Sequence, residues 1–254
     1  MKSLLTIILT TLVTGVSFAQ TKTIHVFVAL CDNVHQGIVP VPTSLGNGKD
    51  TKQNLYWGAT YGVKSYFKNK TIDWELVSVI KTDNPHILER VLFKHASEDI
   101  YMLADGYDGE KIKTCVEDFL KSSNGQLPIT IRHNSESLRF GGASNLAAYI
   151  GHDGLMDFSV DLKYNDSVSN TKDVIILACY SKNYFSSEIE KANANPILWT
   201  THLMAPEAYT LKAAIDGWIN DESGTEIDER AAQVYNKYQK CGIKGARNLF
   251  TTGF

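Results

Sequence analysis

Short apolar runs that end in turn residues alternate with amphipathic stretches along most of this chain. Runs of this kind indicate buried β-strands, whereas apolar positions three and four residues apart indicate helices. The sequence predicts strands at residues 24–30, 74–80, 100–104 and 196–201, a short strand or hairpin arm at 128–134, and two further strands that end at His152 and Cys179. It predicts helices at residues 54–67, 84–95, 110–120, 207–219 and 226–238.

This alternation favours an α/β fold of three layers, in which a mostly parallel sheet of about six strands carries helices on both faces. No Pro/Ser-rich linker divides the chain, so we expect a single domain over residues 20–254. A polar loop at 31–53 contains Val39-Pro40-Val41-Pro42, which cannot be helical. Because long loops are often functional, this loop is expected either to border a cleft or to form an ordered surface excursion.

The first 19 residues predict a signal peptide of bacterial type. Lys2 forms a basic region, residues 4–13 form an apolar core, and Ser17-Phe18-Ala19 resembles a cleavage site. We therefore expect an exported protein, periplasmic or extracellular, that has no membrane association after cleavage. An uncleaved anchor is the alternative, although an apolar core of about ten residues is too short to span a bilayer.

The charge of the chain bears on its possible partners, and its cysteine content bears on possible disulfides. The formal net charge is −3 with both signs interspersed, which gives no basic face for nucleic acid. The four cysteines are Cys31, Cys115, Cys179 and Cys241. In an exported protein they allow up to two disulfides, whose pairing the spacing does not specify. The oligomeric state is likewise not specified.

Several common catalytic motifs are absent from the sequence. There is no Gly-x-Ser-x-Gly elbow, no His-Glu-x-x-His pair and no Cys-x-x-Cys pair. Gly46-Asn47-Gly48-Lys49 lacks the spacing and the final Ser or Thr of a phosphate-binding loop. We therefore expect neither a metal nor a cofactor.

A histidine and a cysteine, each closing an apolar run, are the strongest chemical signal. His152 follows Leu146-Ala147-Ala148-Tyr149-Ile150-Gly151, and Cys179 follows Val174-Ile175-Ile176-Leu177-Ala178. In an open α/β sheet, ligands bind beyond the carboxyl ends of the strands. If the two strands are neighbours, the sheet brings an imidazole and a thiol together, which is a minimal apparatus for nucleophilic catalysis.

These two segments resemble the caspase-like cysteine peptidases, a group that includes caspases, legumains, gingipains and separases. The resemblance implies that Cys179 attacks the carbonyl of a peptide or protein substrate while His152 transfers protons. It also implies that backbone N–H groups near Cys179 and Gly154 hold the oxyanion. The chain departs from the family pattern at Asp153, which separates His152 from Gly154.

Other residues are weaker candidates for the same site. Asp153 or Asp157 would orient His152, although an aspartate beside a glycine is more often a turn former. Asp32 and Asn33 follow the first strand, and His202 follows the strand at 196–201, so all three are candidate substrate-binding residues. Asp32 would select a basic side chain by its charge, and its alternative role is to cap a turn.

Two classes of function remain open. The first is an exported cysteine-dependent hydrolase, a peptidase that uses a Cys179/His152 dyad, or a related enzyme that acts on acyl or amide groups outside proteins. The second is a non-catalytic exported binding protein that keeps the fold and holds a peptide or glycan in its cleft. The hydrolase requires an accessible thiol beside the imidazole, whereas the binding protein allows a buried or disulfide-bonded Cys179.

Overall fold

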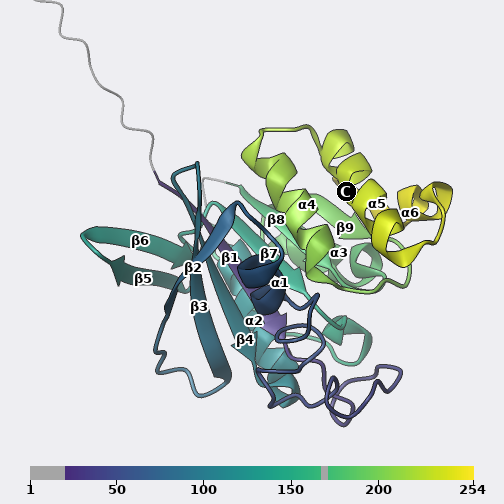
Figure 1. The fold of residues 1–254 in the computed structure, drawn as a ribbon, viewed down its shortest axis with the longest axis horizontal. Coiled ribbons are helices and arrows are strands. Elements are labelled where there is room, and N and C mark those ends of the chain that lie inside the picture. Colours follow the sequence, from purple (N-terminus) through teal and green to yellow (C-terminus); the bar gives the residue numbers. More distant parts are fainter. Residues whose placement is uncertain (1–20, 167–170) are drawn as a thin grey trace, which may run out of the picture.

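An eight-stranded sheet forms the centre of the computed structural model, which describes residues 21–166 and 171–254 (Figure 1). The predicted signal peptide at 1–19 lies outside the described residues. The strand order is β10-β9-β8-β7-β1-β4-β3-β2. The bounds are β1 (Lys22–Ala29), β2 (Trp74–Val79), β3 (Ile87–His95), β4 (Ile100–Tyr107), β7 (Leu146–Ile150), β8 (Lys172–Leu177), β9 (Ala194–Thr200) and β10 (Phe250–Thr251).

The middle of the sheet is parallel and its edges are antiparallel. Strands β4, β1, β7, β8 and β9 run in one direction, whereas β3 is antiparallel to β4, β2 to β3, and β10 to β9. A separate antiparallel hairpin of β5 (Pro128–His133) and β6 (Glu136–Gly141) projects from one end of the molecule in Figure 1.

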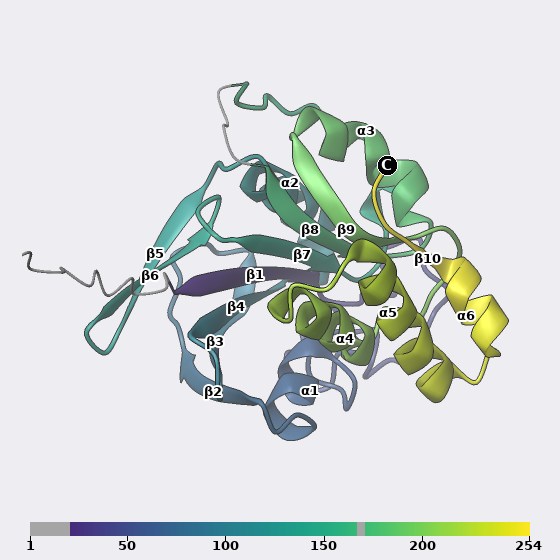
Figure 2. The ribbon, with the colours of Figure 1, turned by 90° about the horizontal axis from the view of Figure 1, so that it is seen from above.

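Helices pack on both faces of the sheet, as Figure 2 shows. On one face lie α1 (Val63–Asn69), α4 (Ala208–Ile219), α5 (Gly224–Gln239) and α6 (Ile243–Leu249). On the other face lie α2 (Ile112–Ser123) and α3 (Ser181–Lys191). Alternate β1 residues enter the two cores, Val26 and Val28 on the first face and Phe27 and Ala29 on the second. Burial on both faces explains why the parallel strands read as unbroken apolar runs.

The α/β fold with a mostly parallel sheet agrees with the sequence-based prediction, but the sheet has eight strands rather than about six. The helix predicted at 84–95 is wrong, because residues 87–95 form strand β3 between β2 and β4. The strand predicted to end at Ala104 continues to Tyr107. The helix predicted from residue 54 begins only at Val63. Two strands, β6 and β10, two α-helices, α3 and α6, and a 3₁₀ helix at Gly154–Met156 were not predicted.

Two further properties bear on the predictions. All four cysteines are free thiols, so the disulfides that the sequence allowed do not form here. Within residues 21–166 and 171–254, no helix has both the length and the apolar character needed to cross a membrane.

A buried ionic cluster joins β1, β3 and β4. Asp105 is completely buried and accepts hydrogen bonds from Arg90 Nε and Nη2, each at 2.6 Å, and from His25 Nε2 at 3.0 Å. The N–H of Gly141 donates to His25 Nδ1 at 3.1 Å, so the imidazole proton lies on Nε2. Burial would raise the pKa of Asp105, but the contacts with Arg90 and His25 hold it below its ordinary value.

We expect Asp105→Asn to lower the free energy of unfolding by about 3–5 kcal/mol, because it leaves the buried Arg90 guanidinium without a countercharge. Urea denaturation at neutral pH measures this change. Lys191→Ala is the control, since it removes an ion pair from an exposed lysine to Glu188 and should cost less than about 1 kcal/mol. A loss below about 1 kcal/mol in Asp105→Asn would contradict the assigned role of this cluster.

Candidate active site

Strands β7 and β8 are parallel neighbours, as the prediction for His152 and Cys179 required. Ile150 pairs with Leu177 at the ends of the two strands, and the N–H of Gly151 donates to Leu177 O at 3.2 Å. His152 and Cys179 each lie two residues beyond the Ile150–Leu177 pair. Both residues line a single cavity of about 450 Å³, at the carboxyl ends of the strands, where α/β proteins bind ligands.

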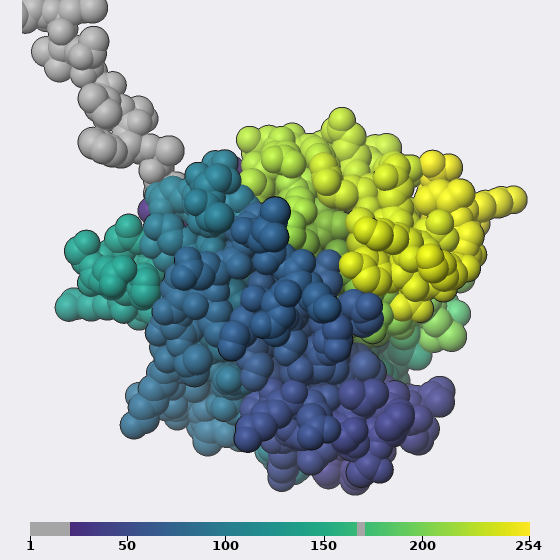
Figure 3. All heavy atoms as spheres, in the orientation of Figure 1, coloured from purple at the N-terminus to yellow at the C-terminus, as the bar shows by residue number. Residues whose placement is uncertain are grey.

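Three segments far apart in the sequence, together with Gln239 at the end of α5, build the rest of the cavity wall. The loop after β1 contributes residues 37–39 and 55–56, the segment after β7 contributes 151–152 and Met156, and the segment after β9 contributes 203–207. In Figure 3 the loop after β1, coloured purple, forms the lower part of the visible face. The prediction that this loop borders a cleft is therefore confirmed for residues 37–39.

His152 is oriented by Asp157 rather than by Asp153. The imidazole Nε2 lies 2.7 Å from Asp157 Oδ2, and the N–H of Gly37 donates to the same oxygen at 2.9 Å. Because a carboxylate only accepts hydrogen bonds, Nε2 carries the proton and the Nδ1 lone pair is the basic site. The Tyr149 hydroxyl donates to the His152 carbonyl oxygen at 2.6 Å and fixes the backbone of this turn.

Two glycines make this geometry possible. Gly151 has a φ of +152°, a backbone conformation that residues with a side chain rarely adopt. At Gly37, a Cβ atom would lie 2.4 Å from Asp157 Oδ1, so a larger residue would displace the carboxylate. Neither glycine was a candidate from the sequence, since the contact between Gly37 and Asp157 joins segments 120 residues apart.

Cys179 occupies a tight turn between β8 and α3. Tyr180, which follows it, has a left-handed conformation with φ of 50° and caps the start of α3. The Ser181 hydroxyl donates to Ile176 O at 2.9 Å, and the Thr200 hydroxyl donates to Ala178 O. These side-chain bonds from α3 and β9 hold the backbone on both sides of the thiol.

The Cys179 thiol is half-buried, and its hydrogen-bonding partner is the backbone of Met204. The N–H of Met204 donates to Sγ at 3.4 Å, and the thiol lies 3.6 Å from Met204 O. Burial raises the pKa of Cys179 and the charge of Asp153 adds to the rise, while the hydrogen bond from Met204 opposes it. Across the described ranges, no hydrogen bond joins the thiol to His152. The thiol is therefore protonated at neutral pH and requires a base to react.

Asp153 and Gly154, predicted as catalytic, lie behind the cavity wall. Asp153 is completely buried, and its Oδ1 accepts from the N–H of Leu155 at 3.0 Å. Its Oδ2 has no partner among the described residues, and burial raises its pKa to about 7. Gly154 is buried against Phe158 and Ile112 and does not line the cavity. The lining glycine next to His152 is Gly151.

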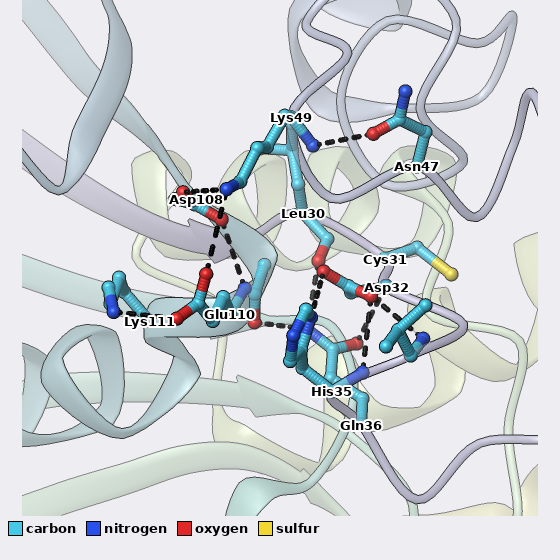
Figure 4. Close-up of polar contacts among 12 residues, drawn as sticks. Leu30, Cys31, Asp32, His35, Gln36, Asn47, Lys49, Asp108, Glu110 and Lys111 are labelled. Atoms are coloured by element: carbon cyan, nitrogen blue, oxygen red, sulfur yellow. Dashed lines mark hydrogen bonds and ion pairs between the residues drawn. The ribbon is translucent and has the colours of Figure 1, made fainter.

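The three predicted substrate-binding residues also lie outside the cavity lining. Asp32 accepts hydrogen bonds from the backbone N–H and the ring Nδ1 of His35 within its own loop. Figure 4 shows these polar contacts, with the Cys31 thiol pointing away from them. Asn33 pairs with Val41 through both of its amide atoms, at 2.8 and 3.0 Å. His202 is exposed and contacts the Thr201 hydroxyl at 2.7 Å.

Two further lining groups were not among the candidate site residues chosen from the sequence. Tyr56 is buried and lines the cavity, and burial, followed by the nearby thiols of Cys31 and Cys179, raises its pKa. Met204 binds the sulfur through its backbone, a contact that no side-chain pattern signals.

Comparison of the chain with protein-family models, curated proteins and solved structures finds no match. In the residues that the structure describes, no group of three or more His, Cys, Asp or Glu side chains is placed to hold a metal ion. The chemistry of the site is therefore argued from its own geometry.

We expect Asp153→Asn to stabilise the protein above pH 7 relative to pH 4. The folded pKa of about 7 lies above the ordinary value of 3.8, so the folded state binds the proton more tightly and wild-type stability falls as pH rises between these values. Asparagine keeps the acceptor for Leu155 and carries no charge. The gain over wild type should grow between pH 4 and 7 to at most about 4 kcal/mol.

Urea denaturation of both proteins at pH 4, 5.5, 7 and 8 measures this difference. Asp161→Asn, at an exposed position of the same segment, is the control and should give a difference that does not vary with pH. A constant difference for Asp153→Asn would mean that this carboxyl titrates normally.

Proposed function

We propose that this protein is a cysteine-dependent hydrolase of the caspase-like type, a peptidase with Cys179 as nucleophile and His152 as general base. The observation that carries the proposal is the position of the thiol and the imidazole on one cavity wall, at the ends of adjacent parallel strands. The hydrogen bond from His152 to Asp157 supports it further, because it leaves Nδ1 as the basic atom.

The reaction follows from these positions. A substrate carbonyl enters the cavity, and His152 Nδ1 takes the proton from Cys179 Sγ as the sulfur attacks the carbonyl carbon. The imidazolium gives that proton to the leaving amine, which departs and leaves a thioester. His152 then takes a proton from water, which attacks the thioester and releases the acid and the thiol.

The developing oxyanion needs a hydrogen-bond donor close to the nucleophile. The backbone N–H of Cys179 donates to no carbonyl oxygen of the described residues and lies against the residue's own sulfur, so the proposal assigns it as the donor to the substrate oxygen beside the nucleophile. One such donor contributes about 3–4 kcal/mol to lowering the barrier. Gly154, the second donor implied by the family resemblance, lies behind the wall, so the proposal assigns this role to Cys179 alone.

The resemblance to caspase-like peptidases supports the same assignment through the order of the two residues, with the histidine strand before the cysteine strand. We further propose, from residues 1–19 alone, that the enzyme is exported to the periplasm or the cell exterior.

A non-catalytic binding protein is the second candidate. It is favoured by the raised pKa of Cys179 and by the hydrogen bonds between its sulfur and Met204, which make the resting thiol unreactive. In this case the cavity would hold a peptide or glycan without covalent chemistry.

Alkylation by iodoacetamide separates the two candidates. Cys241 is exposed and would react by itself, so the test uses the Cys241→Ser background, in which Cys31 and Cys115 remain buried. We expect Cys179 to be alkylated at pH 7.5 and the rate to fall at least about ten-fold in His152→Ala, because the base is lost. Intact-protein and peptide mass spectrometry measure the rate and the site.

His202→Ala is the matched control, since it removes a histidine that lies outside the cavity lining, and it should leave the rate unchanged. Equal alkylation rates in wild type and His152→Ala would refute the hydrolase and support the binding protein.

Asp157 acts as a positioning residue for His152. In Asp157→Asn the amide can donate to Nε2, which moves the imidazole proton to Nδ1 and removes the base. We expect alkylation of Cys179 to slow about ten- to a hundred-fold at pH 7.5, and Asp157→Glu to restore part of the rate. The pH profile of alkylation distinguishes this role from a structural one, because lost positioning should shift the profile while the urea unfolding transition stays in place.

A further inference from the structure

We propose that the cavity beside Cys179 receives a bulky aliphatic or aromatic side chain of the substrate, adjacent to the bond that is cleaved. This inference rests on the proposed hydrolase function and assigns its substrate class. It is argued from the chemistry of the cavity wall and from the exposed apolar residues around the opening.

The wall of the cavity is mostly apolar. Besides His152 and Cys179, its lining includes the aliphatic and thioether side chains of Ile38, Val39, Leu55, Met156, Leu203 and Met204. Its volume of about 450 Å³ lies within the range of about 300–1,000 Å³ that is usual for ligand pockets. A large apolar group would therefore fill the space and remove the wall from water.

The opening is surrounded by apolar side chains that the fold leaves in water. Val39 is 87% exposed, Leu203 is 67% exposed and Met156 is 40% exposed. They come from three separate segments, after β1, β9 and β7, and all line this one cavity. A single exposed apolar residue needs no explanation, but three that converge on one opening indicate a surface that is covered when a ligand binds.

The charges around the cavity exclude an acidic side chain. Among the described residues, no lysine or arginine lines the wall, while the carboxylates of Asp157 and Glu207 lie at or beside it. A substrate carboxylate in the cavity would lose its water and gain no cation.

A basic side chain is the competing occupant because Glu207 lines the cavity. Its Oε2 already accepts from the Tyr209 hydroxyl at 2.7 Å and from Gln239 Nε2 at 2.9 Å. These two donors direct the carboxylate toward α4 and α5, although Oε1 has no partner among the described residues. Asp32, the residue that the sequence suggested for selecting a basic group, does not line the cavity. The geometry thus favours an apolar occupant over lysine or arginine.

Acyloxymethyl ketones of N-acetylated leucine, phenylalanine, lysine and aspartate test this inference. Cys179 sulfur displaces the carboxylate leaving group from the methylene carbon and forms a thioether, and the thiol proton passes to His152. The second-order rate constant of inactivation by each probe is measured by intact-protein mass spectrometry in the Cys241→Ser background. We expect leucine or phenylalanine to exceed lysine and aspartate by about 10- to 200-fold, the range that one apolar group gives in a pocket.

Substitutions of lining residues test whether the preference for apolar probes arises in this cavity. Leu203→Ser and Val39→Ser should each reduce the rate with the leucine probe several-fold more than they reduce the rate with iodoacetamide. Val34→Ser is the matched control, because Val34 is 81% exposed on the same loop as Val39 but does not line the cavity. It should leave both rates unchanged.

The outcomes separate this inference from the proposed function. Alkylation by iodoacetamide that depends on His152, combined with equal rates for all four ketones or with no ketone reaction, keeps the hydrolase and overturns the apolar assignment. A preference for lysine that Glu207→Gln abolishes overturns it in favour of a basic substrate. Iodoacetamide alkylation that is independent of His152 overturns the proposed function and this inference together.

Discussion

The parallel pairing of β7 with β8 is the constraint on which the candidate site depends. The register that pairs Ile150 with Leu177 places His152 and Cys179 at equal distances beyond the sheet. Because side chains alternate between the faces of a strand, a slip of one residue would turn either side chain away from the other. Both strands are completely buried from Leu146 to Ile150 and from Val174 to Leu177, so such a slip would also place core residues on the wrong face.

The chain segment that connects β7 to β8 also contributes a residue to the site. Its described residues, 151–166 and 171, contain no α-helix, and Leu155, Phe158 and Val160 pack against the core that α2 and α3 cover. A short 3₁₀ helix at Gly154–Met156 begins this segment and brings Asp157 to His152. The segment that covers one face of the sheet thus also supplies the carboxylate that orients His152. This explains why the orienting residue is Asp157, five residues after the histidine, rather than Asp153, the next residue.

Burial works against reactivity at this site. It raises the pKa of Cys179 and holds Asp153 next to the thiol as an acid with a pKa of about 7. Burial and the charge of Asp153 favour the protonated thiol, and the N–H of Met204 offsets only part of this effect. Proton transfer to His152 is therefore the step that would decide whether the site is catalytic, and no preformed ion pair is available to replace it.

The pattern of apolar and polar residues predicted the elements that depend mainly on residues close together in the sequence. The strands that end at His152 and Cys179 were identified because buried parallel strands are short apolar runs bounded by turn residues. Residues 84–95 were predicted as a helix because Asn84-Pro85 can start one, and only pairing with β2 and β4 makes residues 87–95 a strand. The strand was predicted to end at Ala104 because Asp105-Gly106 is typical of a turn, whereas the structure keeps Asp105 inside β4 with Arg90, from another strand, as its partner.

The same limit applies to the cavity, because the contacts that decide its geometry join residues far apart in the sequence. Asp157 was one of two candidates for orienting His152, and the choice between them depends on Gly37, whose N–H binds the same carboxylate oxygen. That contact has a consequence for the site as a whole. Gly37 is continuous with Ile38 and Val39 in the cavity wall, so the segment that forms part of this wall also binds Asp157. Apolar contact in the cavity and orientation of the base are therefore not independent, because one segment of the loop supplies both.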